Sequence, residues 1–286
     1  MRLLVISGLS GSGKSIALQA LEDLDYYCVD NLPLSLLPQF VEQIVATAEK
    51  RNIENVAVGI DARNLSRDLG RFGDILGEIR KPGLDCDVIF LGAADNVLIK
   101  RFSETRRKHP LTRVDVSLLE AIAVERELLA PISASADLHI DTSNFNVHQL
   151  RGVIRERVAQ HKSASLSILF MSFGYKYGIP SDADFVFDVR CLPNPHWDPA
   201  LRMRKGNDPE VIRFLGQQPA VGRMYEDIRA FLERWIPSFE AENRNYMSVA
   251  IGCTGGQHRS VYLAETLAAH FKQSRAGVMT RHRELR

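Results

Sequence analysis

Short apolar runs alternate with longer amphipathic segments through the first 160 residues of the chain. Continuous apolar runs are typical of strands buried on both faces, and apolar residues at helical spacing predict helices. Strands are expected at "LLVIS" from Leu3, "YYCVD" ending at Asp30, "VAVGID" ending at Asp61, "DVIFLGA" ending at Ala93 and "LHIDTS" ending at Ser143. Helices are expected near 36–50, 66–79, 95–108, 117–129 and 147–161. Strands that alternate with helices predict an α/β fold with a parallel sheet.

A second α/β pattern follows the small, polar stretch "HKSASLS" at 161–167. Strands are predicted at "LFMSFGYKYG", "FVFDVR" and "YMSVAIGCTGG", and helices at "YEDIRAFLERWIPSFEAE" and "SVYLAETLAAHF". The final segment, "GVMTRHRELR", is interpreted as a basic tail. The sequence therefore predicts two domains, residues 1–160 and residues 165–286, joined by the polar stretch.

Composition and charge narrow the class of protein without fixing its function. The 286-residue chain is 45% hydrophobic and 25% charged, and its net charge of +1 indicates that the whole molecule does not attract polyanions. Residues 161–286 are more basic, with 17 Lys and Arg against 13 Asp and Glu. The four cysteines form no CxxC pair, which indicates reduced thiols in a cytoplasmic protein. No apolar stretch reaches the roughly 18 residues of a membrane span.

The basic tail offers candidate RNA contacts at Lys272, Arg275, Arg281 and Arg283. Such side chains neutralise phosphates, and Phe271 is the one aromatic residue beside them that could stack on a base. The alternative is a solvated terminus with no partner.

The strongest motif follows the first predicted strand, where "GLSGSGKS" fits the phosphate-loop pattern G-x-x-x-x-G-K-[ST] in full. Glycines let several backbone N–H groups face a phosphate chain, and the helix that follows adds its positive end. Lys14 is expected at the β- and γ-phosphates, and the Ser15 hydroxyl is expected to ligate Mg²⁺. The expected contacts to ATP or GTP are Gly8, Leu9, Ser10, Gly11, Ser12, Gly13, Lys14 and Ser15.

Acids at strand ends are candidates for the magnesium shell of this nucleotide site. Asp30, Asp61 and Asp95 all end or follow predicted strands. The segment "DARN" adds Ala62, Arg63 and Asn64 after Asp61 as further candidate nucleotide contacts. The sequence has no Asn-Lys-x-Asp motif for reading guanine, so both ATP and GTP remain candidates.

Three arginines follow the strand that ends near Ala93. Arg101, Arg106 and Arg107 lie where small-molecule kinases carry a lid whose arginines meet the transferred phosphoryl group. A small-molecule kinase is therefore an alternative function. An exposed, solvated helix face is the simpler interpretation of the same residues.

The C-terminal half contains a second candidate anion loop, "GCTGGQHRS", between a predicted strand and a predicted helix. Thr254, Gly255 and Gly256 can turn N–H groups inward, and Arg259 can bind an anion with its planar fork. The Cys-x5-Arg spacing from Cys253 is also that of a cysteine phosphatase, and a structural turn is the third interpretation. Against a phosphatase, Gly stands where phosphatases usually carry His before the cysteine, and no acid loop is evident.

Two Cys-x4-His pairs raise a metal alternative. Cys191 with His196 and Cys253 with His258 could together form a Cys₂His₂ zinc site. Each pair lies in a loop that already has a simpler role, so the anion-binding interpretation is preferred.

Several stretches together resemble the RapZ family of bacterial nucleotide-binding proteins, the RNase adapter proteins. They are "GLSGSGKS", "YYCVDNLP", "DARN", "TRRKHPL", "VFDVRCLPNPHWDP" and "AIGCTGGQHRSVYLAE". The phosphate loop occurs in many families, whereas "FDVRCLPNPHWDP" with "IGCTGGQHRS" is specific. The resemblance covers essentially the whole chain.

The resemblance implies a kinase-like N-terminal domain that binds ATP, with "DARN" as a GTP-contacting segment and weak hydrolysis at most. It implies a C-terminal domain that binds RNA and senses glucosamine-6-phosphate, and a homo-oligomer that presents a small regulatory RNA to ribonuclease E. The implied sugar-phosphate contacts are Arg190, His196, Thr254, Gly255 and Arg259, with Cys253, Gly256 and His258 in the same loop.

Two departures from the family pattern bear on these expectations. The chain has "FLGAAD" at Phe90–Asp95 where relatives tend to carry "FLDAD", so the acid nearest the strand end is missing. The tail also stops at Arg286 without the long Lys/Arg run of the members that bind regulatory RNA.

Overall fold

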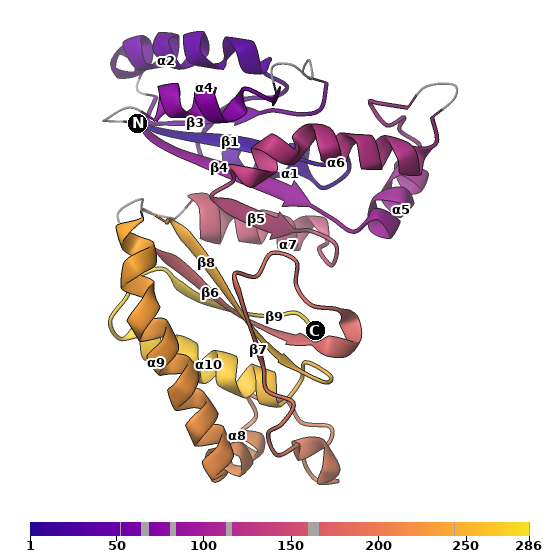
Figure 1. The fold of residues 1–286 in the computed structure, drawn as a ribbon, viewed down its shortest axis with the longest axis vertical. Helices are drawn as coiled ribbons and strands as arrows, with labels where there is room; N and C mark the ends of the chain where they lie inside the picture. The colour runs from indigo at the N-terminus through magenta and orange to yellow at the C-terminus, as the bar shows by residue number, and fades with distance from the viewer. Residues whose placement is uncertain are drawn as a thin grey trace. The chain divides into compact units, whose positions relative to one another are not determined.

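The computed structural model describes residues 1–51, 53–63, 69–80, 84–112, 116–159, 166–242 and 244–285. The chain divides into two compact units, Met1–Gln160 and His161–Arg286, and each has its own hydrophobic core (Figure 1). The predicted α/β fold with parallel sheets is confirmed, because every strand pairing among the described residues is parallel. No helix in these ranges is long and apolar enough to cross a membrane.

The N-terminal unit is built on a sheet with the strand order β2-β3-β1-β4-β5. Its strands are β1 (Arg2–Gly8), β2 (Tyr27–Val29), β3 (Asn55–Gly59), β4 (Asp85–Gly92) and β5 (Leu138–Asp141). Every residue of the central strand β1 is buried, as the continuous apolar run predicts for a strand covered on both faces. Parallel pairing brings the carboxyl ends of β1, β3 and β4 to one edge of the sheet.

Helices pack against this sheet in two groups (Figure 1). One group comprises α1 (Lys14–Glu22), α7 (Val147–Val153) and the π-helix η2 (Ile154–Ala159). The other comprises α2 (Leu37–Arg51), which follows the short 3₁₀ helix η1 (Leu34–Leu36), with α4 (Phe72–Ile79), α5 (Asp95–Thr105) and α6 (Leu118–Ala134).

Residue chemistry explains where several of these helices begin and end. α6 and α7 each begin at a capping box, formed by Ser117 with Glu120 and by Asn146 with Gln149. α5 ends earlier than the predicted residue 108, because Arg106 adopts the left-handed conformation with φ of 51°.

The C-terminal unit contains a sheet with the order β7-β8-β6-β9. Its strands are β6 (Ser167–Gly174), β7 (Phe185–Asp188), β8 (Tyr246–Cys253) and β9 (Val278–His282). Its helices are α8 (Pro209–Gly216), α9 (Pro219–Ala241) and α10 (Arg259–Lys272), with 3₁₀ helices η3 (Tyr175–Tyr177) and η4 (Pro195–Trp197). α10 contacts β6, β8 and β9 and supplies the fully buried Phe271, whose ring stacks on Phe170 of β6.

The basic tail is the clearest wrong prediction about the fold. The segment forms an edge strand, β9, paired in parallel with β6 from Ile168↔Val278 to Ser172↔His282. His282 bridges Ser172 and Glu265 of α10, at 2.8 Å and 2.9 Å, which fixes the strand to its neighbours. α8 is a further element that the sequence pattern does not predict. Residues 161–165 of the predicted junction lie outside the described residues.

Candidate functional site

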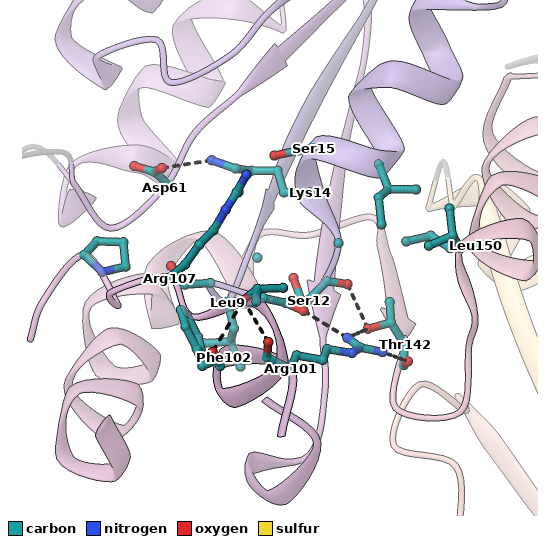
Figure 2. Close-up of a pocket in the computed structure, with 18 of the residues that line it drawn as sticks. Leu9, Ser12, Lys14, Ser15, Asp61, Arg101, Phe102, Arg107, Thr142 and Leu150 are labelled. Atoms are coloured by element: carbon teal, nitrogen blue, oxygen red, sulfur yellow. Dashed lines mark hydrogen bonds and ion pairs between the residues drawn. The ribbon is translucent and has the colours of Figure 1, made fainter. Parts of the chain in front are cut away.

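The phosphate-loop motif lies between β1 and α1, at the carboxyl edge of the N-terminal sheet. Two of its carbonyl groups are bound from outside the loop: Arg101 Nη1 donates to Gly11 O at 2.9 Å, and Thr142 Oγ1 donates to Ser12 O at 2.8 Å. Arg101 also donates to both the hydroxyl and the carbonyl oxygen of Thr142, as Figure 2 shows. Hydrogen bonds to its carbonyl oxygens therefore fix the loop in place.

The donors of the same loop are left available. Among the residues that the structure describes, none accepts a hydrogen bond from the backbone N–H of Gly11, Gly13, Lys14 or Ser15. All four residues line one cavity, and the last two form the first turn of α1, whose N–H groups have no partner within the helix. Carbonyls turned away and N–H groups left unpaired are the arrangement that binds an anion.

The cavity has a volume of about 630 Å³, large enough for a nucleotide. Charged side chains line part of it, among them Asp30, Asp61 and Arg63. Its apolar lining includes Phe102, Phe145, Val147 and Leu150. Figure 2 shows Lys14 reaching toward Asp61, with Leu150 on the other side of the loop.

Asp61 connects the phosphate loop to the "DARN" segment. Its carboxylate accepts a hydrogen bond from Lys14 Nζ at 2.9 Å and forms an ion pair with Arg63 Nη2 at 2.6 Å. Burial alone would raise the pKa of Asp61, but the bonds from Arg63 and the charge of Lys14 together hold the pKa below its ordinary value. Asp61 is thus an ionised acid beside the phosphate-binding lysine. Ala62 is buried beside it, and Asn64 lies outside the described residues.

The other two candidate acids have different surroundings. Asp30 lines the cavity, and its carboxylate lies 3.4 Å from Lys14 Nζ. Asp95 begins α5, does not line the cavity and pairs with Arg126 of α6 at 2.6 Å. The structure therefore places Asp30 and Asp61, and not Asp95, where a magnesium shell could form.

The arginine-rich lid is corrected in part. Arg101 is not a free cation over the phosphates, because its guanidinium donates to the carbonyl of Gly11 from outside the loop. Burial lowers the pKa of Arg101. Arg106 ends α5 and does not line the cavity, whereas Arg107 and Lys108 do. The next residue, His109, is buried against Glu125, a contact that no local sequence signal predicts.

The donor set fits a magnesium ion held mainly by nucleotide phosphates. Mg²⁺ takes oxygen ligands and usually few of them from protein, and Ser15 with Asp61 supplies a hydroxyl and a carboxylate in the same cavity. Elsewhere in the described ranges, no group of three or more His, Cys, Asp and Glu could hold a metal. The zinc alternative therefore fails: Cys191 is exposed, Cys253 is buried, and the rings of His196 and His258 are 6.4 Å apart.

The second anion loop joins β8 to α10. A Cβ added at Gly252 would lie 2.4 Å from Phe173 and 2.5 Å from Tyr175, so no larger residue fits before the cysteine. Gly256 has φ of 71°, and a Cβ there would meet Glu284 at 2.5 Å. Packing thus accounts for glycine at both positions.

Cys253 is surrounded by hydrogen-bond donors. Its Sγ lies 3.1 Å from Ser260 Oγ and accepts the N–H of Gly256 at 3.2 Å. Burial would raise the pKa of Cys253, but these hydrogen bonds and the nearby charge of Arg259 outweigh it and lower the pKa. The loop therefore stabilises negative charge at its base.

Arg259 is a buried cation that backbone oxygens hold. Its Nη1 donates to the carbonyls of Arg190 and Leu192 at 2.7 Å and 3.0 Å, and its Nη2 lies 3.4 Å from Thr254 Oγ1. None of the carboxylates in the described ranges forms an ion pair with it. The nearby Asp188 carboxylate is already paired with Arg190, so the buried charge of Arg259 is only partly balanced and is suited to an anionic ligand.

The remaining predicted contacts surround this loop to different degrees. Arg190 is already paired with Asp188 at 2.7 Å, and its guanidinium lies 4.0 Å from the centre of the Tyr175 ring. His196 is exposed in η4, and His258 is buried directly before α10. Thr254 and Gly255 form the accessible turn between Cys253 and the buried part of the loop.

The four basic residues assigned to the tail do not form a free tail. Lys272 is exposed at the end of α10, Arg275 pairs with Glu240, and Arg281 lies within β9. Arg283 donates to the carbonyls of Gly178 and Tyr177.

Another surface of the same unit carries exposed aromatic and basic side chains. Trp197 is 76% exposed and Met203 is 89% exposed, and Arg202 and Arg204 beside them are exposed as well. Large apolar side chains exposed beside cations are typical of a binding surface.

Comparisons with known proteins agree with this division of the chain. A model of the RapZ-like N-terminal domain matches residues 1–162, and a model of the RapZ C-terminal domain matches residues 166–286. A protein named nucleotide-binding protein from Thioalkalivibrio sulfidiphilus is 57% identical over 286 residues, covering 100% of both chains. One of the same name from Methylococcus capsulatus is 54% identical, covering 100% of this chain and 96% of its own.

Solved structures match more distantly. Shikimate kinase from Bacteroides thetaiotaomicron is 16% identical and aligns with 54% of this chain and 94% of its own, with a TM-score of 0.35. A likeness at that level leaves the fold assignment to rest on the strand pairings of this chain.

Proposed function

The chain belongs to the RapZ family, and from that premise we propose that it is a regulator with two ligand sites. The N-terminal unit binds one nucleoside triphosphate, ATP or GTP, with Mg²⁺. The C-terminal unit binds a phosphorylated amino sugar and RNA. We propose a regulator and not an enzyme: each site is assigned to ligand binding, and no residue is assigned a catalytic role.

One observation supports nucleotide binding above the others. Two carbonyls of the phosphate loop are bound from outside it, and four residues whose N–H groups are unpaired within the described ranges line one cavity. Lys14 adds a flexible positive charge that Asp61 and Asn31 hold in place, at 2.9 Å and 3.1 Å. A triphosphate would exchange these contacts for its own oxygens.

ATP and GTP are proposed as alternative ligands of one site. The resemblance assigns ATP to the phosphate loop and GTP to "DARN". Asp61 and Lys14 are in direct contact, and Arg63 lines the same cavity. A second nucleotide beside the first would have to share Lys14 and Asp61, so the two segments serve one nucleotide.

Magnesium would be held by Ser15 and, through its shell, by Asp61. When bound, the ion neutralises charge between the β- and γ-phosphates. Asp61 would remain ionised beside Lys14, because its pKa is lowered.

Calorimetry of ATP binding to the wild type and to Lys14→Ala tests the nucleotide proposal. Losing a charge-assisted contact in a desolvated site costs roughly 2–4 kcal/mol, and each 1.4 kcal/mol corresponds to about tenfold in Kd. Lys100→Ala is the matched control, since Lys100 is exposed on α5 and does not line the cavity. Equal ATP affinity in all three proteins would reject the phosphate-loop assignment.

The C-terminal ligand is proposed to be glucosamine-6-phosphate, the sugar phosphate that the family resemblance implies. The buried Arg259 supports an anion at this loop, because its donors reach only backbone oxygens and a hydroxyl in the described ranges. Thr254 and Gly255 form the exposed side of the loop, where a sugar phosphate could enter. Calorimetry with glucosamine-6-phosphate on Arg259→Ala tests this, with loss of binding as the expected result.

RNA binding, delivery of a small regulatory RNA to ribonuclease E and homo-oligomerisation in the cytoplasm are proposed from the family resemblance. Arg275 and Arg283 are held by protein groups, so exposed cations of the same unit are the better candidates for RNA contacts. They are Lys272, Arg202, which also donates to the His196 carbonyl at 3.2 Å, and Arg204, which lies 3.7 Å from Glu210. Each phosphate contact contributes roughly 0.7–0.9 to the slope of log affinity against log salt.

Filter binding of one structured RNA over a salt series tests these three cations. Replacing Lys272, Arg202 and Arg204 together by alanine should reduce the slope by roughly two to three. An unchanged slope would place any RNA surface elsewhere. Arg223→Ala, an exposed cation on α9, serves as a control for net charge.

A small-molecule kinase is the second candidate function. Its supporting observation is that Asp30 and Arg63 line the cavity beside Lys14, where an acceptor could be deprotonated and held. A kinase would consume ATP rapidly when its acceptor is supplied. A regulator would turn ATP over slowly with every sugar and nucleoside tried, which a coupled ADP-release assay distinguishes.

A further inference from the structure

A buried carboxylate connects the phosphate loop to the segment after α5. We propose that Glu125 and His109 form a positioning pair that fixes the phosphate loop against the segment carrying Arg107 and Lys108, and so sets affinity for the terminal phosphate of a nucleotide. The inference rests on the proposed nucleotide binding and names residues that the sequence motif does not contain.

Glu125 anchors the loop at Ser10. Its carboxylate accepts the Ser10 backbone N–H at 2.8 Å and the Ser10 hydroxyl at 2.6 Å. The side chain of Glu125 is 0% exposed. Ser10 therefore lines the cavity with both of its donors already used, which makes it an anchor of the loop and leaves phosphate binding to Gly11, Gly13, Lys14 and Ser15.

His109 is the third group on the same carboxylate. Its Nε2 lies 3.1 Å from Glu125 Oε2, and its side chain is also 0% exposed. Its Nδ1 accepts the backbone N–H of Leu111 at 3.2 Å, which places the proton of a neutral ring on Nε2. His109 thus donates to Glu125, and its ring lies 5.2 Å from that of Phe102, which lines the cavity.

The pair determines where two cations lie. Arg107 and Lys108 directly precede His109, both line the cavity, and neither forms an ion pair within the described ranges. A buried carboxylate is tolerated only with its hydrogen bonds satisfied, so Glu125 holds Ser10 and His109 in one arrangement. Because His109 is fixed, the two cations are presented to the same space as the loop.

An apolar side chain cannot replace this carboxylate. Glu125 receives three donors: Oε2 accepts the Ser10 N–H and the His109 Nε2–H, and Oε1 accepts the Ser10 hydroxyl. In Glu125→Leu all three donors lose their acceptor, and the His109 tautomer cannot reverse without losing the bond from Leu111. Glu125→Leu is therefore expected to break the link. Glu125→Gln can keep it, with the amide oxygen in place of Oε2 and the NH₂ group facing the Ser10 hydroxyl, which can accept.

The test compares ATP, ADP and adenosine by calorimetry on full-length variants. Removing a hydrogen bond to a charged group costs roughly 1.5–3 kcal/mol, which is about 10- to 100-fold in Kd. Glu125→Leu and His109→Phe should weaken ATP by about that factor, ADP by less, and adenosine not at all. Glu125→Gln, which can keep the three contacts, should stay close to the wild type. Glu127→Gln, an exposed glutamate on the same helix, should match the wild type.

Two outcomes overturn the inference: unchanged ATP affinity in Glu125→Leu and His109→Phe, or an equal loss for all three ligands, which indicates general damage to the domain. Thermal melts establish that each variant folds, and Ser10→Ala repeats the test if Glu125→Leu does not fold. Lys14→Ala separates the two proposals. If Lys14→Ala loses ATP while Glu125→Leu and His109→Phe retain it, only the positioning role fails. If Lys14→Ala also retains ATP, nucleotide binding at this loop fails first.

Discussion

Replacing Gly13 by alanine tests whether the phosphate loop needs the backbone that the structure gives it. Gly13 has φ of 108° and ψ of 18°, a conformation that side-chain-bearing residues rarely adopt. An added Cβ would lie 2.5 Å from Leu150 Cδ2. That atom ends a flexible side chain and can move, so the backbone strain of roughly 1–3 kcal/mol dominates. The free energy of unfolding is expected to fall by about that amount.

Nucleotide binding should suffer as well as stability. Gly13 carries one of the unpaired N–H groups and directly precedes Lys14, so relaxing its φ turns two donors away from the cavity. We expect ATP affinity to fall by at least about tenfold, the equivalent of 1.4 kcal/mol. Urea unfolding measures the first effect and calorimetry the second.

Gly77→Ala is the matched control. Gly77 lies in α4, where an added Cβ meets nothing within 4 Å, so alanine should stabilise the helix by roughly 0.5–1 kcal/mol. ATP affinity should be unchanged in this control. Wild-type stability and ATP affinity in Gly13→Ala would refute the argument, because the loop would then tolerate another backbone conformation.

Further outcomes follow from the two sites and the exposed surface. In calorimetry, Arg259→Ala should abolish glucosamine-6-phosphate binding, whereas Cys253→Ser should retain most of it. The reason is that the guanidinium supplies charge and a thiol is only a weak donor. The reverse result would make the thiol a ligand or nucleophile. Since the pKa of Cys253 is lowered, a thiolate forms in the loop as pH rises and repels phosphate. The ratio of sugar-phosphate affinity in the wild type to that in Cys253→Ser should therefore fall with rising pH, because titration of the phosphate itself affects both proteins alike. The lowered pKa of Asp61 contributes folding stability that is fully present above the ordinary pKa of 3.8 and is lost as pH falls below that value. In urea unfolding, the free energy of unfolding of Asp61→Asn should therefore fall less than that of the wild type over this acid range. Trp197→Ala should weaken RNA in filter binding without changing the salt slope, since stacking releases no counterions; a changed slope would mean that the loop has moved.

Local patterns were sufficient to predict much of the fold and the position of the phosphate loop. The first fifteen residues are enough to predict the phosphate loop. They contain the buried apolar run of β1, the glycines after it and the start of the helix at Lys14. The Gly252–Ser260 segment is similar, because a buried strand and a helix frame it. Elements of this kind follow from periodicity and turn chemistry alone.

Contacts between distant residues were not predictable in the same way. Ser10 and Glu125 are 115 positions apart, and no periodic pattern marks their contact. The position of Arg101 after a strand, where small-molecule kinases carry a lid, predicts a free cation, whereas its guanidinium is bound to Thr142 and Gly11 from other elements. β9 was missed because an edge strand with polar residues resembles a tail until its partner is known.

A calorimetric competition between ATP and GTP on the wild-type protein tests the single nucleotide site most directly. We expect one site per chain for either nucleotide alone. We also expect no further heat when GTP is titrated into protein saturated with a large excess of ATP, because Lys14 and Asp61 belong to one cavity. Two independent sites, or GTP binding at full affinity in the presence of saturating ATP, would contradict it.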